Sequence, residues 1–299
     1  MASALRRDGS GTSGLAGRLA FVAVVALAVA PAVFAARTQL KPAFNLFSPQ
    51  QDIEIGEKLA AKVPAEMPLL NDRRVDDYLN KLGRRLAAHT PGYQYPYQYR
   101  AVNSPAINAF ALPGGDIYVN RGAIDAADTE SELAGVMAHE TSHVALRHGT
   151  NQASKAYLAE IPAALLGGWL GNQSSIGAEI AQLTTGVALG SLFLKYSRDD
   201  ETQADVLGTQ ILYDSGYDPR ALARFFERIE AQNKTQPVEF FSDHPNPDHR
   251  IERVTEEVEN LGGLPPGYRV DSPEFHKIKD YLRTLPPPPR QPAAPAQPQ

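Results

Sequence analysis

Two histidines four residues apart carry the clearest chemical signal in this chain. Residues 136–146 read Val-Met-Ala-His-Glu-Thr-Ser-His-Val-Ala-Leu and contain His139, Glu140 and His143. Residues four apart on an α-helix project from one face, so both imidazoles can bind a single tetrahedral zinc ion. Glu140 follows His139 by about 100° around the helix. It would lie beside the ion, where a carboxylate can take a proton from an activated water molecule.

A motif this short can also arise by chance. The two histidines would then simply occupy an exposed helix face. However, the apolar neighbours Ala138, Val144, Ala145 and Leu146 predict a mostly buried helix. Because buried histidines need polar partners, the metal site is the favoured interpretation.

An acidic segment downstream can supply a third ligand. Ser197 is a suitable N-cap for a helix whose first turn contains Asp199, Asp200 and Glu201. Taken alone, such a turn is usually explained by the helix dipole. Glu201 and Asp205 lie on one face, however, so Glu201 can bind zinc while Asp205 accepts a hydrogen bond from a ligand histidine.

Four segments together resemble the zinc peptidases that include the CAAX prenyl proteases, the HtpX heat-shock proteases and the BepA-type periplasmic protease-chaperones. The segments are residues 108–115, the His139 motif with Arg147 and His148, residues 197–205, and residues 241–245 with Arg250 and Ile251. Residues 45–49 are also similar to the start of the periplasmic members. The resemblance covers about residues 45–260, and the motifs occur in the family's order.

The resemblance implies a role for each matching residue. His139, His143 and Glu201 correspond to the ligands of one zinc ion per chain, and Glu140 corresponds to the general base. Asp205 corresponds to the carboxylate that hydrogen-bonds a ligand histidine. His148 and His249 have no ligand spacing to a motif residue, and we expect them to be structural.

His244 falls where the family places a histidine that faces the metal. It could be catalytic and stabilise the oxyanion of the tetrahedral intermediate. In some relatives the equivalent segment instead occupies the zinc and blocks it. The residues do not decide between these two roles. Asn108 and Ala109 are expected to line the cleft as an edge strand whose free backbone groups bind an extended peptide.

The surrounding elements predict an α+β fold that is mostly helical and zincin-like, with a small antiparallel sheet ahead of a central HExxH helix. Thr129 and Glu132 predict a capping box at the start of that helix, and Gly149 is expected to end it. Three strands are expected, over the alternating tyrosines 93–99 and at residues 107–112 and 117–119. Further helices are predicted to begin near Pro49, Val75, Ser197, Pro219, Pro247 and Pro273.

The two ends of the chain differ in composition from the region between them. Residues 1–35 combine basic residues, an apolar run over 19–34 and small residues at Val33 and Ala35, which predicts a signal peptide or N-terminal anchor. Residues 36–285 are expected to form the zinc peptidase domain, and 286–299 a Pro-rich disordered tail. The Gly-, Ala- and Leu-rich region 157–195 is expected to form helices, either as a lid or membrane-facing flap or as plain core.

Composition narrows the function further. The chain is 43% hydrophobic, has a net charge of −5 and contains no cysteine. Because it lacks a basic stripe, it is a poor candidate for binding nucleic acid. About fifty residues follow His249, too few for the helical-repeat domain of the BepA type, which needs three or more repeats of about 34 residues. We expect a stand-alone catalytic domain exported to the periplasm or cell envelope.

The expected function is zinc-dependent endopeptidase activity on unfolded or misfolded envelope proteins, in protein quality control, with association at the membrane surface as a further possibility. One alternative is a latent zinc protein that binds misfolded envelope proteins like a chaperone without cutting them. A retained general base, Glu140, argues against that alternative. Another alternative is a zinc hydrolase with the same ligands and a substrate other than protein.

Overall fold

The computed structural model describes residues 37–160, 196–234, 238–245 and 249–289. The expected signal segment and the apolar helices expected between Ile161 and Leu194 lie outside these ranges. The helices are α1 (Pro49–Ala60), α2 (Val63–Glu66), α3 (Arg73–Ala87), α4 (Arg121–Ala126), α5 (Glu130–Ala145), α6 (His148–Glu160), α9 (Arg198–Asp214), α10 (Ala221–Asn233), α11 (Phe240–Asp243), α12 (Arg250–Asn260) and α13 (Pro273–Thr284). The strands are β1 (Gln98–Val102), β2 (Ala109–Ala111) and β3 (Asp116–Asn120). The fold is therefore mostly helical with a small sheet, as predicted.

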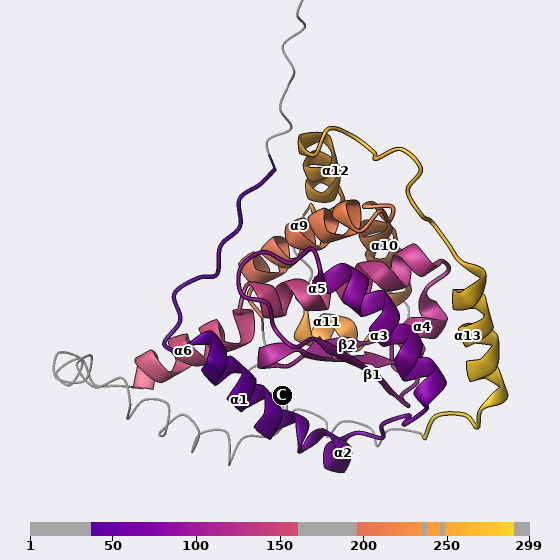
Figure 1. The fold of residues 1–299 in the computed structure, drawn as a ribbon, viewed down its shortest axis with the longest axis horizontal. Helices are drawn as coiled ribbons and strands as arrows, with labels where there is room; N and C mark the ends of the chain where they lie inside the picture. Colours follow the sequence, from indigo (N-terminus) through magenta and orange to yellow (C-terminus); the bar gives the residue numbers. More distant parts are fainter. Residues whose placement is uncertain (1–36, 161–195, 235–237, 246–248, 290–299) are drawn as a thin grey trace, which may run out of the picture. The chain divides into compact units, whose positions relative to one another are not determined.

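Helix α5 is buried along its whole length and forms the centre of this arrangement. It contacts α9, α10 and α3, and also the strand β2. Figure 1 shows α9 on one side of α5 and the sheet on the other. Side chains on α5 can therefore meet groups from elements far apart in the sequence.

The two ends of α5 differ in detail from the predicted caps. At the start, Thr129 accepts a hydrogen bond from the backbone of Glu132, but the Glu132 carboxylate bonds the backbone N–H of Asp128 instead of that of Thr129. At the other end, α5 stops at Ala145 and Gly149 lies inside α6, so the prediction that Gly149 ends the helix is wrong. The helix is interrupted near Arg147 instead, which has φ 61°.

Arg147 keeps this left-handed conformation because its side chain is firmly held. Its guanidinium Nε lies 2.6 Å from Oδ2 of Asp52 on α1, and Nη2 donates to the carbonyl of Phe47 at 2.5 Å. A left-handed conformation is uncommon for a residue other than glycine. Contacts that the local sequence does not reveal therefore set the direction of α6.

The sheet differs from the predicted antiparallel sheet in one respect. Strands β2 and β3 form an antiparallel hairpin, whereas β1 pairs with the far side of β3 in parallel, giving the order β1-β3-β2. Residues 103–108 carry the chain over the end of β3, where the backbone of Ser104 accepts a hydrogen bond from Gly122 and that of Asn108 accepts one from Asn120. This link places β2 at the sheet edge. Strand β1 begins only at Gln98 and not at Tyr93.

The described helices include none that is both long enough and apolar enough to cross a membrane.

A close contact between α3 and β1 gives a first prediction. A Cβ atom added at Gly83 would lie 2.1 Å from Cε2 of Tyr99. The Tyr99 ring cannot easily move, because it is buried and its hydroxyl lies 2.8 Å from Oγ1 of Thr141 on α5. Alanine favours the helix by about 1 kcal/mol, but overpacking typically costs about 1–3 kcal/mol. Because a 2.1 Å approach is far shorter than van der Waals contact, the cost lies in the upper part of that range. We therefore expect Gly83→Ala to lower the free energy of unfolding by roughly 1–2 kcal/mol in chemical denaturation.

The exposed neighbour Arg84 provides the matched control on the same helix. Arg84→Ala should change the free energy of unfolding by no more than about 0.5 kcal/mol. A Gly83→Ala chain as stable as the wild type would contradict the proposed packing of α3 on β1.

Candidate metal centre

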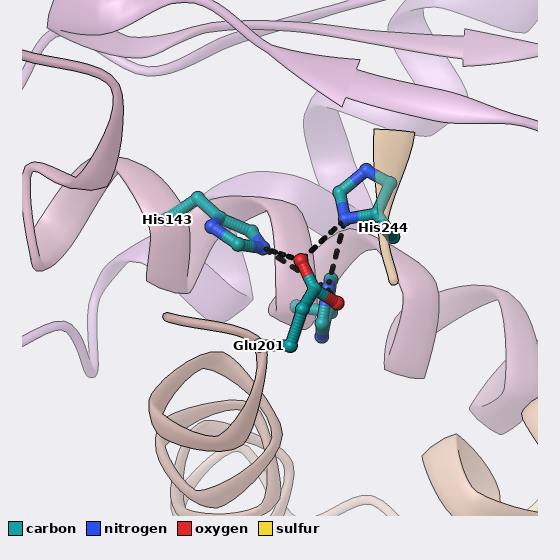
Figure 2. A group of neighbouring side chains, drawn as sticks. His143, Glu201 and His244 are labelled. Carbon is teal, nitrogen blue, oxygen red and sulfur yellow. Dashed lines mark hydrogen bonds and ion pairs between the residues drawn. The ribbon is translucent and has the colours of Figure 1, made fainter. Parts of the chain in front are cut away.

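Four buried side chains from three elements meet at the middle of α5. His139 and His143 come from α5, Glu201 comes from the first turn of α9, and His244 directly follows α11. One potential ligand atom from each lies within 4.8 Å of the other three. Figure 2 shows the carboxylate of Glu201 between the rings of His143 and His244, with these side chains pointing toward one another. The helical spacing brings the first two together, and the packing of α9 and α11 adds the others.

The distances within this group are short. Nε2 of His139 lies 3.0 Å from Nε2 of His143 and 3.3 Å from Oε2 of Glu201. Nε2 of His143 lies 3.4 Å from Oε1 of Glu201. Nδ1 of His244 lies 2.9 Å from Oε1 of Glu201 and 3.4 Å from Nε2 of His139. Three imidazole nitrogens and one carboxylate oxygen are a donor set that zinc accepts.

Glu140 provides an independent test of whether these residues fit a metal ion. Its side chain is completely buried. Among the described residues, neither of its carboxylate oxygens has a hydrogen-bond partner, and Oε1 lies 3.5 Å from Nε2 of His244. An isolated buried carboxylate is costly unless it is paired or neutralised. A cation held by the neighbouring donors would supply the missing compensation, so the residues fit a bound metal.

Burial and neighbouring charges shift the ionisation of these groups in different directions. Burial raises the pKa of Glu140 to about 8. Burial would also raise the pKa of Glu201, but His244 and His139 hold it well below its usual range. Burial lowers the pKa of His143, while the carboxylates of Glu201 and Glu140 outweigh burial and raise that of His244. The Glu201 carboxylate is therefore the most readily ionised group of the cluster and suits a metal ligand.

Asp205 and Arg250 lie next to the four donor residues and contact two of them, His139 and Glu201. Oδ1 of Asp205 lies 3.2 Å from Nδ1 of His139, the ring nitrogen that faces away from the cluster. The Arg250 guanidinium bonds Oδ2 of Asp205 at 2.7 Å and lies 3.4 Å from Oε2 of Glu201. It also stacks over the ring of Phe226 at 3.9 Å. Arg250 therefore contacts one of the four donor residues directly and a second through Asp205.

His143 has a different environment. Its ring stacks on Tyr196, with ring centroids 3.7 Å apart. Its Nδ1 lies 2.9 Å from Nδ1 of His148 at the start of α6. His249, by contrast, is 76% exposed and lies outside the cluster.

The expected substrate-binding residues lie beside the segment that carries His244. Ala109 begins β2, and its N–H bonds the side-chain oxygen of Asn108. The Asn108 amide donates to carboxylate oxygens of Glu239 and Asp243, each at 3.2 Å. The polar groups of Asn108 therefore hold α11 against the sheet edge in this structure.

Site contacts of Arg250, His148 and Tyr196 were not predicted from the sequence. Arg250 and His148 belong to the motifs that carry the family resemblance, and only this membership could have pointed to them. Tyr196 gives no such signal, because its stacking on His143 depends on how α9 packs against α5.

An HExxH helix with a downstream glutamate on a second helix, packed against a small sheet, defines a zincin-like metallopeptidase. The family model described as Peptidase family M48 matches residues 70–258. The chain belongs to this family, which confirms the resemblance drawn from the sequence.

Named relatives support the same assignment. The chain is 34% identical over 209 residues to the "Beta-barrel assembly-enhancing protease" of Escherichia coli (strain K12), an alignment that covers 67% of this chain and 42% of the relative. It is 28% identical to the "Metalloprotease YcaL" of Escherichia coli (strain K12), covering 60% of this chain and 71% of the relative. It is also 28% identical to the "Mitochondrial metalloendopeptidase OMA1" of Schizosaccharomyces pombe (strain 972 / ATCC 24843), covering 60% and 52%. The chain thus spans about two fifths of the length of the first relative.

Proposed function

We propose that this chain is a zinc-dependent metalloendopeptidase that cleaves unfolded or misfolded proteins in the cell envelope, in protein quality control. The single observation that carries the proposal is the buried donor cluster on α5 and α9 with the Glu140 carboxylate beside it. Membership of a peptidase family and relatives named as proteases support the same activity.

In the proposed site, His139, His143 and Glu201 hold one zinc ion. When bound, the ion supplies Lewis acidity to a water molecule and to the scissile carbonyl. Oδ1 of Asp205 lies 3.2 Å from Nδ1 of His139, where it can accept a hydrogen bond and orient the ring, and Arg250 holds Asp205 in place.

Glu140 carries the protons of the reaction. Its carboxylate takes a proton from the attacking water and then delivers a proton to the leaving amine. It can do this because it lies on the same helix as two of the proposed ligands but one residue along from the first, so it would lie beside the ion without binding it. Its burial also keeps bulk water from competing for the proton.

His244 has two possible roles in this site, catalyst or plug, and its position favours the plug. Its Nδ1 lies among the donor atoms, 2.9 Å from Glu201, where it can occupy a coordination position that a substrate or water needs. Its other nitrogen lies 3.5 Å from Glu140. This arrangement also supports the second candidate function, a latent zinc protein that binds misfolded envelope proteins without cleaving them.

Replacing His244 tests the two roles directly. We expect His244→Ala to raise peptide cleavage by up to about tenfold. The reason is that the variant frees a coordination position that the His244 ring otherwise occupies for most of the time. Zinc content should stay at one per chain. A loss of roughly 10²-fold in turnover would instead assign His244 to oxyanion stabilisation. The exposed His249→Ala should change neither quantity and serves as the control.

An extended polypeptide is the proposed substrate because β2 lies at the edge of the sheet. The hydrogen-bonded pairs with β3 include Asn108 with Asn120 and Leu112 with Asp116. Alternate residues of an antiparallel strand face away from the partner, so the backbone groups of Ala109 and Ala111 face outward, where a peptide can pair. The Ala109 N–H, which bonds the side-chain oxygen of Asn108 in this structure, must exchange that partner for the peptide. Since Asn108 holds α11 at this edge, α11 must shift when a peptide pairs there. A substrate-analogue complex without backbone contacts at residues 109–111 would rule this out.

Export is proposed from residues 1–35, with the mature protein in the periplasm or cell envelope and at the membrane surface. Sequencing the amino terminus of the protein recovered from cells, together with fractionation, tests this. A chain recovered from the cytosol with Met1 intact would contradict it.

The proposed activity is tested by measuring zinc content and cleavage of casein, an unfolded substrate, with the same preparation. We expect one zinc per chain, loss of cleavage after chelation, and recovery when zinc is restored. Zinc without any cleavage, even in His244→Ala, would favour the latent binding protein. A well-folded chain that binds no zinc would overturn both candidates.

A further inference from the structure

His148 lies against a proposed zinc ligand, although no step of the proposed reaction uses it. Its side chain is 1% exposed, and its Nδ1 lies 2.9 Å from Nδ1 of His143. The two rings are inclined by 74°, with centroids 5.0 Å apart. This is hydrogen-bond distance between two ring nitrogens in the buried interior.

The positions of the hydrogens follow from the direction in which His143 faces. Its Nε2 faces the donor cluster, 3.0 Å from His139 and 3.4 Å from Glu201. A ring that binds metal through Nε2 carries its hydrogen on Nδ1. For the two nitrogens to form a hydrogen bond, Nδ1 of His148 must then be the acceptor, and the hydrogen of His148 must be on Nε2.

The surroundings of His148 suit a hydrogen on its Nε2. Its Nε2 lies 3.9 Å from Oδ1 of Asp200, on the side where a hydrogen is required. Asp200 is itself held by Ser197, whose backbone N–H and hydroxyl donate to Oδ2 at 2.9 and 2.7 Å. The capping box that begins α9 therefore places a carboxylate behind His148.

The two proposed histidine ligands thus have different partners on their outer nitrogens. Nδ1 of His139 faces the carboxylate of Asp205, which is tied to Arg250. Nδ1 of His143 faces the imidazole of His148. A hydrogen bond to the outer nitrogen fixes the orientation and tautomer of a ligand histidine.

We propose that His148 is a positioning residue, whose Nδ1 accepts the Nδ1 hydrogen of His143 and so presents Nε2 of His143 to the metal. The proposal rests on the zinc site of the proposed function, and it extends the site to the start of α6.

A matched pair of variants tests it. Asparagine places its side-chain oxygen where Nδ1 of His148 lies relative to Cβ, whereas leucine has the same branched shape without an acceptor. We expect His148→Leu to weaken zinc binding about 10–100-fold, measured by competition with a chromophoric chelator. His148→Asn should recover most of this loss. The exposed His89→Leu should bind zinc as the wild type does.

Thermal unfolding of the metal-free chains separates positioning from a general structural effect. The Leu and Asn variants should unfold at similar temperatures in the absence of metal while differing in zinc affinity. Equal zinc affinity in wild type and His148→Leu would overturn the proposal, as would an Asn variant that binds as weakly as the Leu variant. A wild type that binds no zinc would instead be a failure of the proposed function.

A measurement on the wild-type chain tests the proposal even if the variants do not fold. Nitrogen-15 NMR of the imidazole rings reports which ring nitrogen carries the hydrogen. We expect His143 protonated at Nδ1 and His148 protonated at Nε2 in the zinc-loaded chain. A His148 protonated at Nδ1 could not accept from His143 and would overturn the proposal.

Discussion

Glu140→Gln should reduce peptide cleavage by about 10³-fold while leaving zinc content at one per chain. A positioned general base contributes roughly 10²–10⁴-fold to the rate, and glutamine cannot accept the proton. The residue is buried beside the donor cluster but is not part of it. The amide has nearly the same shape as the carboxylate, so the four donors should keep their places.

The measurement pairs turnover on casein with metal analysis of the same sample. Glu227→Gln makes the same chemical change at an exposed position on α10 and should retain full activity. If Glu140→Gln cleaved at the wild-type rate, another group would have to be the base. If it lost its zinc, Glu140 would be acting as a ligand.

Glu201→Ala should remove both zinc and activity. Glu201 supplies the only carboxylate among the four donors of the described cluster, so only three neutral imidazoles would remain as donors. The substitution also removes a counter-charge from Arg250, which lies 3.4 Å away and is nearly buried. Loss of a residue that only hydrogen-bonds a metal ligand lowers metal affinity by up to roughly 100-fold. Because Glu201 is proposed to bind the metal itself, we expect a larger fall in zinc affinity.

Chelator competition measures this affinity, and Glu252→Ala on the exposed face of α12 is the matched control. Metal-free Glu201→Ala should still fold, because Asp205 continues to pair with Arg250. Circular dichroism checks this. Unchanged zinc affinity would show that His244 and the two helical histidines form the site without Glu201.

The two variants together separate metal binding from proton transfer. Glu140→Gln tests the base with the metal in place, and Glu201→Ala tests the ligand. His244→Ala, which retains the metal ligands and the base, then reports whether the wild-type site is open or blocked by the His244 ring. The three results distinguish an active peptidase, a latent one and a zinc protein without hydrolytic chemistry.

The local sequence predicted those parts of the site that depend on helical periodicity. His139 and His143 share a face because they are one helical turn apart on α5, and the same rule pairs Glu201 with Asp205 on α9. Ser48, Ser197 and Ser272 mark helix starts because a hydroxyl next to free backbone N–H groups is stabilising wherever the helix lies. These features need only neighbouring residues.

His148 shows why the sequence could not predict the rest. Five residues after His143, it would point about 140° away on a continuous helix. Helix α5 ends at Ala145, however, and the backbone is left-handed at Arg147, which is fixed by Asp52 from α1. An ion pair between residues 95 positions apart thereby turns His148 back toward His143.

The same reason applies to His244, Arg250 and the sheet. The sequence places His244 near the metal only by resemblance, whereas the packing of α11 on the sheet edge puts its Nδ1 among the donor atoms. Arg250 reaches Asp205 and Glu201 because α12 packs on α9. Strand β1 is parallel to β3 because a link crosses the end of β3. Local periodicity thus determined which side chains can act together on one helix. Contacts between distant segments decided how the donor side chains are oriented and buried, and which residues join them from other elements.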